Sequence, residues 1–264
     1  MIINNNISSL TATNAIAKNE ANMNKSIEKL SSGMRINKAA DDAAGLAVSE
    51  KMRSQIRGLE VAKRNIQDGV SLVQTAEGAL DEVHNMLQRM RELNVQAVNG
   101  IYTTEDKANL QAETTALLAQ IDEIANKTNF NGVNLLKGGA AIGLQTGLNK
   151  GDQISVAAVD ATAATLGLDA LDITSADSLA KLDTAIETIS TNRATLGATQ
   201  NRLEHTLANA TNTHENLSAA ESRIRDVDMA EEMSNYSAKQ VLLQTGMSIA
   251  AQANQKTSMI TKLM

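Results

Sequence analysis

The sequence contains no proline, no cysteine and no tryptophan, and its 264 residues include only one phenylalanine and two tyrosines. Without cysteine the chain can form neither disulfides nor thiolate metal sites. Without proline it lacks the commonest interruption of a helix. A compact globular core draws much of its buried area from aromatic side chains. Their scarcity therefore favours thin helix-to-helix contacts made by Leu, Ile, Val, Ala and Met.

The charge balance and the hydropathy exclude further classes. The net charge is −6 and the pI is about 5.2, which argues against a nucleic-acid partner because such a partner calls for a basic surface. No apolar run approaches the ~18 residues of a membrane span, so we expect no membrane insertion. Residues 1–22 contain no apolar signal-peptide core, so we also expect no cleaved signal peptide.

Two long segments repeat apolar residues at every seventh position. Because an α-helix turns every 3.6 residues, this period places one narrow apolar seam along each helix, and each seam needs a partner helix. The simplest partner is the other seam of the same chain, which predicts a rod with both termini at one end. The first seam consists of Met52, Leu59, Ile66, Val73, Leu80 and Leu87, and the second of Leu182, Ile189, Leu196, Leu203, Ala210, Leu217 and Ile224.

The N-terminal half carries the signals of three helices. A weakly apolar helix over residues 1–30 is ended by Gly33, which can adopt the left-handed cap. Asp41 or Asp42 can cap a long helix over residues 43–99. Small residues in the second seam row of that helix allow close approach of a neighbour, and they include Ala62, Gly69 and Ala76. A third helix at about 104–127 follows a short connection and should fold back antiparallel.

The C-terminal half begins with turn signals and alternating apolar residues, which predict a β-hairpin at about 140–157. The second long helix spans about 175–224. Asp228 with Glu231 then predicts a capping box that opens a last helix. The expected fold is mainly α: a long antiparallel helical-bundle rod with a small β-hairpin insert (residues 41–227), plus a terminal coiled-coil domain formed by both chain ends (residues 1–40 and 228–264).

No motif for chemistry occurs in the sequence. There is no HExxH, no P-loop and no GxGxxG. His205 and His214 are nine residues apart on a helix and face opposite sides, so they cannot share a metal, and His84 has no matching ligand at metal spacing. We therefore expect no enzymatic activity, no metal site and no cofactor.

One surface of the first long helix is a candidate for a partner contact. Relative to the seam through Leu87, Arg89 points to solvent and Leu93 shares its flank one turn later. An apolar side chain beside an outward arginine is typical of a binding surface. The alternative, which is equally compatible with the spacing, is that Leu93 packs on the antiparallel third helix.

Several short motifs occur in a characteristic order. They lie at residues 2–7 (IINNNI), 27–37 (IEKLSSGMRIN), 41–45 (DDAAG), 88–93 (QRMREL), 129–132 (NFNG), 222–224 (SRI) and 251–255 (AQANQ). Together they resemble bacterial flagellin over essentially the whole chain. Because few residues separate Phe130 from the second long helix, the resemblance is to a short form that lacks the variable outer domains.

The resemblance implies a structural subunit that polymerises into the flagellar filament for swimming motility. It implies type III export to the outside of the cell without a cleaved signal peptide. The implied partners are other flagellin subunits, an export chaperone at the C-terminal region, and the filament cap and hook-associated proteins. The terminal helices would line the filament core, with Ile3, Ile7, Leu10, Ile27, Leu30, Val241, Leu242, Leu243 and Ile249 as polymerisation residues.

The resemblance further implies recognition by a host Toll-like receptor that senses flagellin. The family's contact motif maps onto Arg89, Leu93 and Glu113, with Gln88 beside them. Three other classes of protein share part of this pattern or are excluded by it. A hook–filament junction protein shares the terminal pattern, a flagellin-borne peptidase would need HExxH, and a plain coiled-coil adhesin would lack the β insert.

Overall fold

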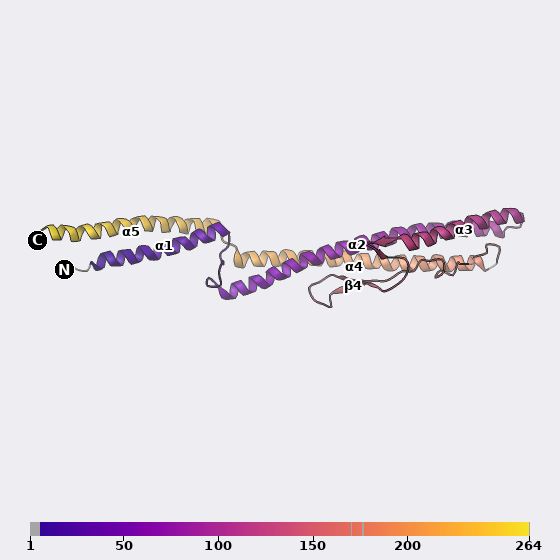
Figure 1. Cartoon of the computed structure of the whole chain (residues 1–264), viewed down its shortest axis with the longest axis horizontal. Coiled ribbons are helices and arrows are strands. Elements are labelled where there is room, and N and C mark those ends of the chain that lie inside the picture. Colours follow the sequence, from indigo (N-terminus) through magenta and orange to yellow (C-terminus); the bar gives the residue numbers. More distant parts are fainter. Residues whose placement is uncertain (1–5, 170, 176, 264) are drawn as a thin grey trace. The chain divides into compact units, whose positions relative to one another are not determined.

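A computed structural model of the chain describes residues 6–169, 171–175 and 177–263 (Figure 1). The helices are α1 (Ile7–Ser32), α2 (Ala43–Val98), α3 (Thr104–Lys127), α4 (Ser178–Arg225) and α5 (Met229–Leu263), and the strands are β1 (Asn129–Phe130), β2 (Val133–Asn134), β3 (Ile142–Gln145) and β4 (Gln153–Val156). The predicted class, mainly α with a small β-hairpin insert, is confirmed. None of the described helices is both long and apolar enough to cross a membrane.

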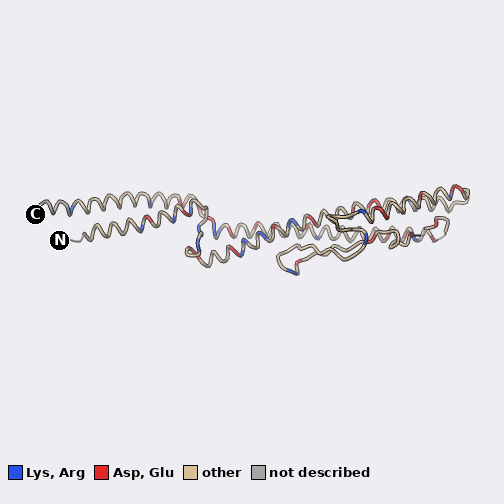
Figure 2. Tube along the Cα trace, in the orientation of Figure 1, with Lys and Arg blue, Asp and Glu red and all other residues tan. Residues whose placement is uncertain are grey.

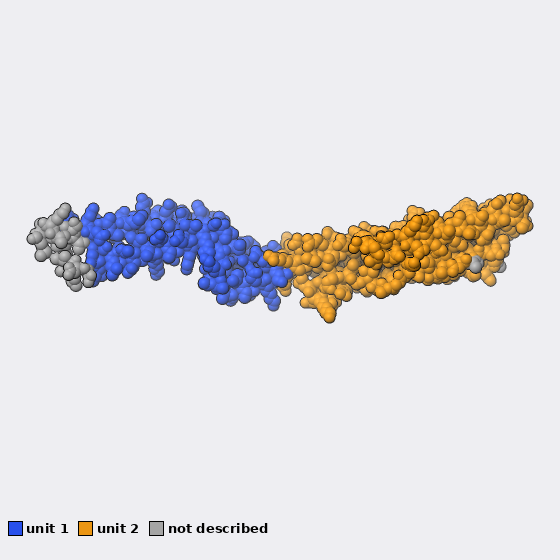
Figure 3. All heavy atoms as spheres, in the orientation of Figure 1, with its two compact units in different colours: residues 1–54, 216–264 blue, residues 55–215 orange. Residues whose placement is uncertain are grey.

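The chain divides into two compact units (Figure 3). Unit 1 combines the two chain ends, Met1–Ser54 and Asn216–Met264, and unit 2 is the continuous segment Gln55–Glu215. The two long helices α2 and α4 each contribute residues to both units. Unit 1 therefore contains α1, α5 and one end of each long helix.

The core of unit 2 is the antiparallel seam between α2 and α4. Ile66, Val73, Leu80 and Leu87 of α2 are fully buried, as are the α4 seam residues Leu182, Ile189, Leu196 and Leu203. Ion pairs flank the seam and fix the antiparallel direction, since Arg91 Nε lies 2.7 Å from Asp183 Oδ1 and Arg193 Nη2 lies 3.0 Å from Asp81 Oδ1. The predicted pairing of the two heptad seams is thereby confirmed.

Small residues on α2 admit the β3–β4 hairpin. A Cβ atom added at Gly69 would lie 2.4 Å from Leu144 Cδ1, and one added at Gly58 would lie 2.3 Å from Leu148 Cδ2. The Asn65 side chain donates a 3.2 Å hydrogen bond to the Gln145 carbonyl between these two contacts. The neighbour that the small residues accommodate is therefore a hairpin rather than another helix.

A second, shorter hairpin precedes it. The strands β1 and β2 pair through Phe130 and Val133, and the two residues between them, Asn131 and Gly132, have φ values of 51° and 81°. Positive φ at both central positions is the signature of the type I′ turn, whose twist matches that of paired strands. The sequence indicated this turn, but the two-residue strands around it were not predicted.

The chain between β4 and α4 packs along α3. The sequence did not predict this packing. Ala161, Leu168 and Ile173 in this segment are fully buried. The Gln111 side chain of α3 donates to the Leu171 carbonyl at 2.8 Å and accepts from the Ile173 N–H at 3.0 Å. The segment therefore forms a third layer of unit 2 without regular secondary structure.

Helix caps agree with the residues that predicted them. Gly33 has φ 70° and donates its N–H to the Lys29 carbonyl, which closes α1 in the left-handed conformation. Asp42 Oδ1 accepts the Gly45 N–H at 2.9 Å at the start of α2, which selects Asp42 over Asp41 as that cap. Asp228 Oδ1 accepts the N–H groups of Ala230 and Glu231 at the start of α5.

The buried seam generates a test of the fold. Replacing fully buried Ile66 by Ala should lower the free energy of unfolding by about 2–5 kcal/mol, because methyl groups are lost and a cavity remains. The matched control is Val61→Ala on the same helix, where the side chain is 47% exposed. Urea unfolding followed by circular dichroism measures both variants, and equal losses would contradict a core centred on this seam.

Candidate functional site

The two chain ends pack against each other as the antiparallel helices α1 and α5 of unit 1. Cross-helix hydrogen bonds hold the pair, with Asn6 Nδ2 donating to the Ala253 carbonyl at 3.1 Å and Asn19 Nδ2 donating to the Lys239 carbonyl at 2.8 Å. The Lys239 ammonium donates in turn to Ser26 Oγ at 2.7 Å. Polar groups therefore form a large part of the contact between these two helices.

The less exposed stripe of each helix identifies the contact face. On α1 this stripe repeats every three to four residues and consists of Ser9, Ala12, Ile16, Asn19, Met23, Ser26 and Leu30. On α5 it consists of Glu232, Tyr236, Lys239, Leu243, Gly246, Ala250 and Ala253. Both stripes have heptad spacing, but small and polar residues outnumber large apolar ones. A seam of this composition buries little apolar area, so it holds the pair only weakly.

Many large apolar residues of the two helices lie outside this contact and are exposed. Ile7 is 64% exposed and Val241 is 62% exposed. The other exposed apolar residues of the pair are Leu10, Ile27, Met229, Met233, Leu242, Met247, Ile249 and Met259. Of the residues predicted for the filament core, Leu30 and Leu243 lie on the α1–α5 contact face, and Ile3 lies outside the described residues.

Most of the apolar residues predicted for the filament core on α1 therefore do not meet α5. Ile7, Leu10 and Ile27 are exposed, whereas the contact runs through residues such as Ala12 and Ile16. The physical reason is the partner, since α5 presents Gly246, at which a Cβ atom would lie 3.0 Å from Ile16 Cγ1. The small residues give close approach, while bulky residues such as Ile7 and Leu10 remain exposed.

Long stretches of α1 and α5 also carry no charged residue (Figure 2). No charged residue occurs between Lys239 and Lys256 on α5. None occurs between residue 7 and Lys18 on α1. An open groove of about 270 Å³ lies on this part of the pair and is lined mainly by apolar groups of Ala12, Ala15, Ile16, Asn19, Leu242, Gly246 and Ile249. Apolar surface of this kind is typical of a protein–protein contact.

A second candidate surface lies in unit 2, where α2 faces α3. Arg89 donates from Nη2 and Nε to Glu113 Oε1 at 2.9 and 3.0 Å, and from Nη1 to Glu92 Oε2 at 3.2 Å. Hydrogen bonds to Glu113 first, and then to Glu92, raise the pKa of the Arg89 guanidinium above its ordinary value. Gln88 is exposed and hydrogen-bonds to His84. The predicted residues Gln88, Arg89 and Glu113 are therefore all exposed, and Arg89 and Glu113 are joined by an ion pair.

Leu93 does not belong to this exposed surface, which corrects the prediction that it shares an outward flank with Arg89. Its side chain is fully buried, as are those of Met90, Asn94 and Ala97 around it. Here α2 has neighbours on two sides, with α3 reached through Glu113 and α4 through Asp183. Two neighbours require a wider apolar face than a single seam, so Leu93 acts in packing.

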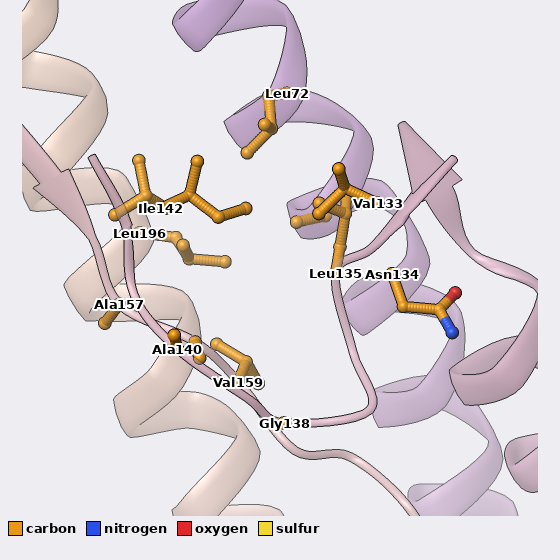
Figure 4. Close-up of a pocket in the computed structure, with 13 residues that line it drawn as sticks. Leu72, Val133, Asn134, Leu135, Gly138, Ala140, Ile142, Ala157, Val159 and Leu196 are labelled. Carbon is orange, nitrogen blue, oxygen red and sulfur yellow. The ribbon is translucent and has the colours of Figure 1, made fainter. Parts of the chain in front are cut away.

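An apolar cavity lies in unit 2 (Figure 4). It has a volume of about 260 Å³ and lies between α2, α4 and both hairpins, with Leu72, Leu135, Ile142, Val159 and Leu196 among its lining residues. The described residues that line it include no titratable side chain. Within the described part of the chain, no group of three His, Cys, Asp or Glu residues could hold a metal ion.

Comparisons with protein-family models match both halves of the chain. Residues 3–141 match the bacterial flagellin N-terminal helical region. Residues 179–264 match the bacterial flagellin C-terminal helical region. The unmatched interval between them contains the β3–β4 hairpin and the segment that packs along α3.

Individual proteins are similar over the full length. A flagellin of Halalkalibacterium halodurans is 48% identical and a flagellin of Bacillus subtilis is 47% identical, in each case over 100% of both chains. Flagellin FlaB2 of Treponema pallidum is 46% identical with the same coverage. The crystal structure of Bacillus cereus flagellin is 38% identical, with a TM-score of 0.51 over 56% of this chain and 88% of that one.

The burial of Leu93 generates a test that separates packing from surface. Leu93→Ala should lower the free energy of unfolding by about 2–5 kcal/mol because it opens a cavity. Gln88→Ala, its exposed neighbour, should change that free energy by no more than about 0.5 kcal/mol. Urea denaturation of both variants checks this, and a Leu93→Ala variant as stable as Gln88→Ala would contradict the burial.

Proposed function

The chain belongs to the bacterial flagellin family, and from this membership we propose how it assembles, by burying its terminal helix pair against other copies. As a short member without variable outer domains, it is a structural subunit of the flagellar filament. The single observation that carries the assembly mechanism is the exposed apolar face of α1 and α5, which lies outside their mutual contact.

The physical argument rests on area removed from water. Burying a Leu, Ile, Val or Met side chain contributes roughly 1.5–3 kcal/mol relative to leaving it exposed. Leu10, Val241, Leu242 and Ile249 are each more than half exposed in the single chain. Neighbouring copies that cover these side chains would supply a driving force that the half-polar α1–α5 contact does not supply on its own.

Assembly would also order the terminal helices. A helix pair with few buried apolar groups is close to the limit of stability in water. Any partner that binds only the ordered form stabilises that form by mass action. We therefore assign residues 1–40 and 228–264 to the inner core of the filament, with Ile3, Ile7, Leu10, Ile27 and Leu30 contributed by the first segment. Residues 41–227 would lie outside this core.

The family setting supports further proposals on location and partners. The protein would be secreted and would reside in the extracellular filament. An export chaperone would bind its C-terminal region, and the filament cap and hook-associated proteins would contact it in the flagellum. It would act as a structural protein and not as an enzyme, which is supported by its membership of the flagellin family.

The runner-up is a hook–filament junction protein, and seeded growth separates the two. Purified monomer added to short sheared filament seeds should elongate them steadily into long helical filaments, as seen by negative-stain electron microscopy. Binding that stops after one layer at the seed ends would indicate the junction protein instead.

The assembly mechanism is tested by placing polar groups on the exposed face. Leu242→Gln should leave the unfolding of the monomer unchanged, because the side chain is 61% exposed. It should slow seeded elongation at least about tenfold, because an apolar group of this size contributes 1.5–3 kcal/mol when buried. The control Val61→Gln makes a similar change on α2. Elongation of Leu242→Gln at the wild-type rate would overturn this mechanism.

We further propose that unit 2 binds the flagellin-sensing Toll-like receptor through Gln88, Arg89 and Glu113. The support is that these three side chains are exposed and that Arg89 on α2 forms an ion pair with Glu113 on α3. Arginine is enriched at the centre of protein interfaces because its planar guanidinium can bind a partner and an internal carboxylate together. Leu93 would contribute by holding α2 in place beneath this surface.

Receptor binding has a matched test in the same ion pair. Arg89→Ala should weaken binding to the purified receptor ectodomain at least about tenfold, as expected for an interface hot spot. The swap Arg89→Glu with Glu113→Arg keeps an ion pair between α2 and α3 but moves the positive charge, so it should not restore the affinity. Surface plasmon resonance measures each variant, and unchanged affinity of Arg89→Ala would contradict the proposal.

A further inference from the structure

The two connectors that lead to the terminal helices are joined to each other in unit 1. Met34, just after α1, forms an antiparallel β-bridge with Asp226, just after α4. The Arg35 N–H donates to the Arg225 carbonyl at 2.6 Å, and the Val227 N–H donates to the Gly33 carbonyl at 3.1 Å. The end of α1 at Ser32 and the start of α5 at Met229 are thus each only a few residues from a shared backbone contact.

The side chain of Arg225 lies at the centre of this junction. Its side chain is only 10% exposed, and its Nη1 lies 2.5 Å from Glu50 Oε1 on α2. Its Nε points to Met34 Sδ at 3.1 Å. One guanidinium therefore contacts α2 and the α1–α2 connector while its own backbone carbonyl accepts from Arg35.

The permanent charge of arginine determines which partner this contact requires. A guanidinium stays charged at all physiological pH values, so a buried one needs a carboxylate partner. Glu50 supplies that partner, and it also lies 3.8 Å from Arg53 Nη1 on the next turn of α2. The thioether of Met34 is a weak acceptor. The position of the first connector is therefore tied to the charge pair between Arg225 and Glu50.

A second arginine strengthens the same end of α4. Arg35 Nη2 donates to the Ile224 carbonyl at 2.7 Å. Positive groups are favourable at a helix C-terminus, where the last carbonyls lack helical partners. Ile36, the next residue of the connector, is buried, and at Gly45 a Cβ atom would lie 2.9 Å from Ile36 Cδ1. The connector is thus fixed to the end of α4 and the start of α2 together.

We propose that Arg225, paired with Glu50, is a positioning residue for filament assembly, which sets the register in which α1 and α5 meet. This proposal rests on the assembly mechanism proposed above. The half-polar α1–α5 contact gives little energy for choosing among registers, since stripes rich in small residues pack similarly after a slip of one heptad. The joined connectors remove that freedom, because α1 ends at Ser32 and α5 begins at Met229, on either side of the bridge.

The test is a charge swap with two readouts. Arg225→Glu alone should make the Arg35 and Val227 amides exchange with solvent at least about tenfold faster, because an uncompensated buried charge opens the junction. The same variant should slow seeded elongation at least about tenfold, because a mispaired terminal helix cannot add to the seed. Adding Glu50→Arg to Arg225→Glu rebuilds the pair in reverse and should return both readouts toward wild type.

The control is the ion pair between Arg193 and Asp81 in unit 2, which also joins α4 to α2. Arg193→Glu should leave amide exchange at Arg35 and Val227 unchanged. Wild-type elongation by Arg225→Glu, or a double swap that leaves elongation slow, would overturn the positioning role. Wild-type protein that fails to elongate seeds would instead overturn the assembly mechanism, so the two failures are distinguishable.

Discussion

The apolar seam between α2 and α4 is the contact on which the rest of unit 2 depends. It is built from aliphatic side chains that repeat every seven residues, and those at its centre, such as Ile66, Leu80 and Ile189, are fully buried. With almost no aromatic residue available, the core gains area by length rather than by thickness. The small residues Gly58 and Gly69 then let a hairpin lie directly on α2, which widens a two-helix contact into a layered core.

The terminal helices use the same periodicity for the opposite purpose. Their mutual contact is rich in small and polar side chains, with Asn19 and Ser26 hydrogen-bonded across it. Leu10 and Leu242 remain exposed. Such a pair is only weakly stable by itself. It becomes more stable when other copies cover its exposed apolar residues. In unit 2 the apolar seam is buried within the chain, whereas in unit 1 apolar residues remain exposed. A subunit that polymerises requires this combination.

The connectors determine how the unfinished part is presented. A buried Arg225 with one carboxylate partner is a directional contact, whereas apolar packing between small residues is tolerant of slippage. The Arg225–Glu50 ion pair and the bridge between the connectors define the register in which α1 and α5 begin to pair. They do so without making the α1–α5 contact itself strong. Weak pairing with a defined start suits helices that complete their packing only during assembly.

The sequence by itself determined the helices, their antiparallel seam and the cap at Gly33, because periodicity and capping chemistry are local properties of a chain. It also carried the motifs that identify the family. Only the tertiary structure decided which stripe of α1 meets α5, and that Leu93 is buried while Arg89 is exposed. Periodicity defines a face relative to a helix's own axis, but the number and shape of the neighbours decide which face is covered.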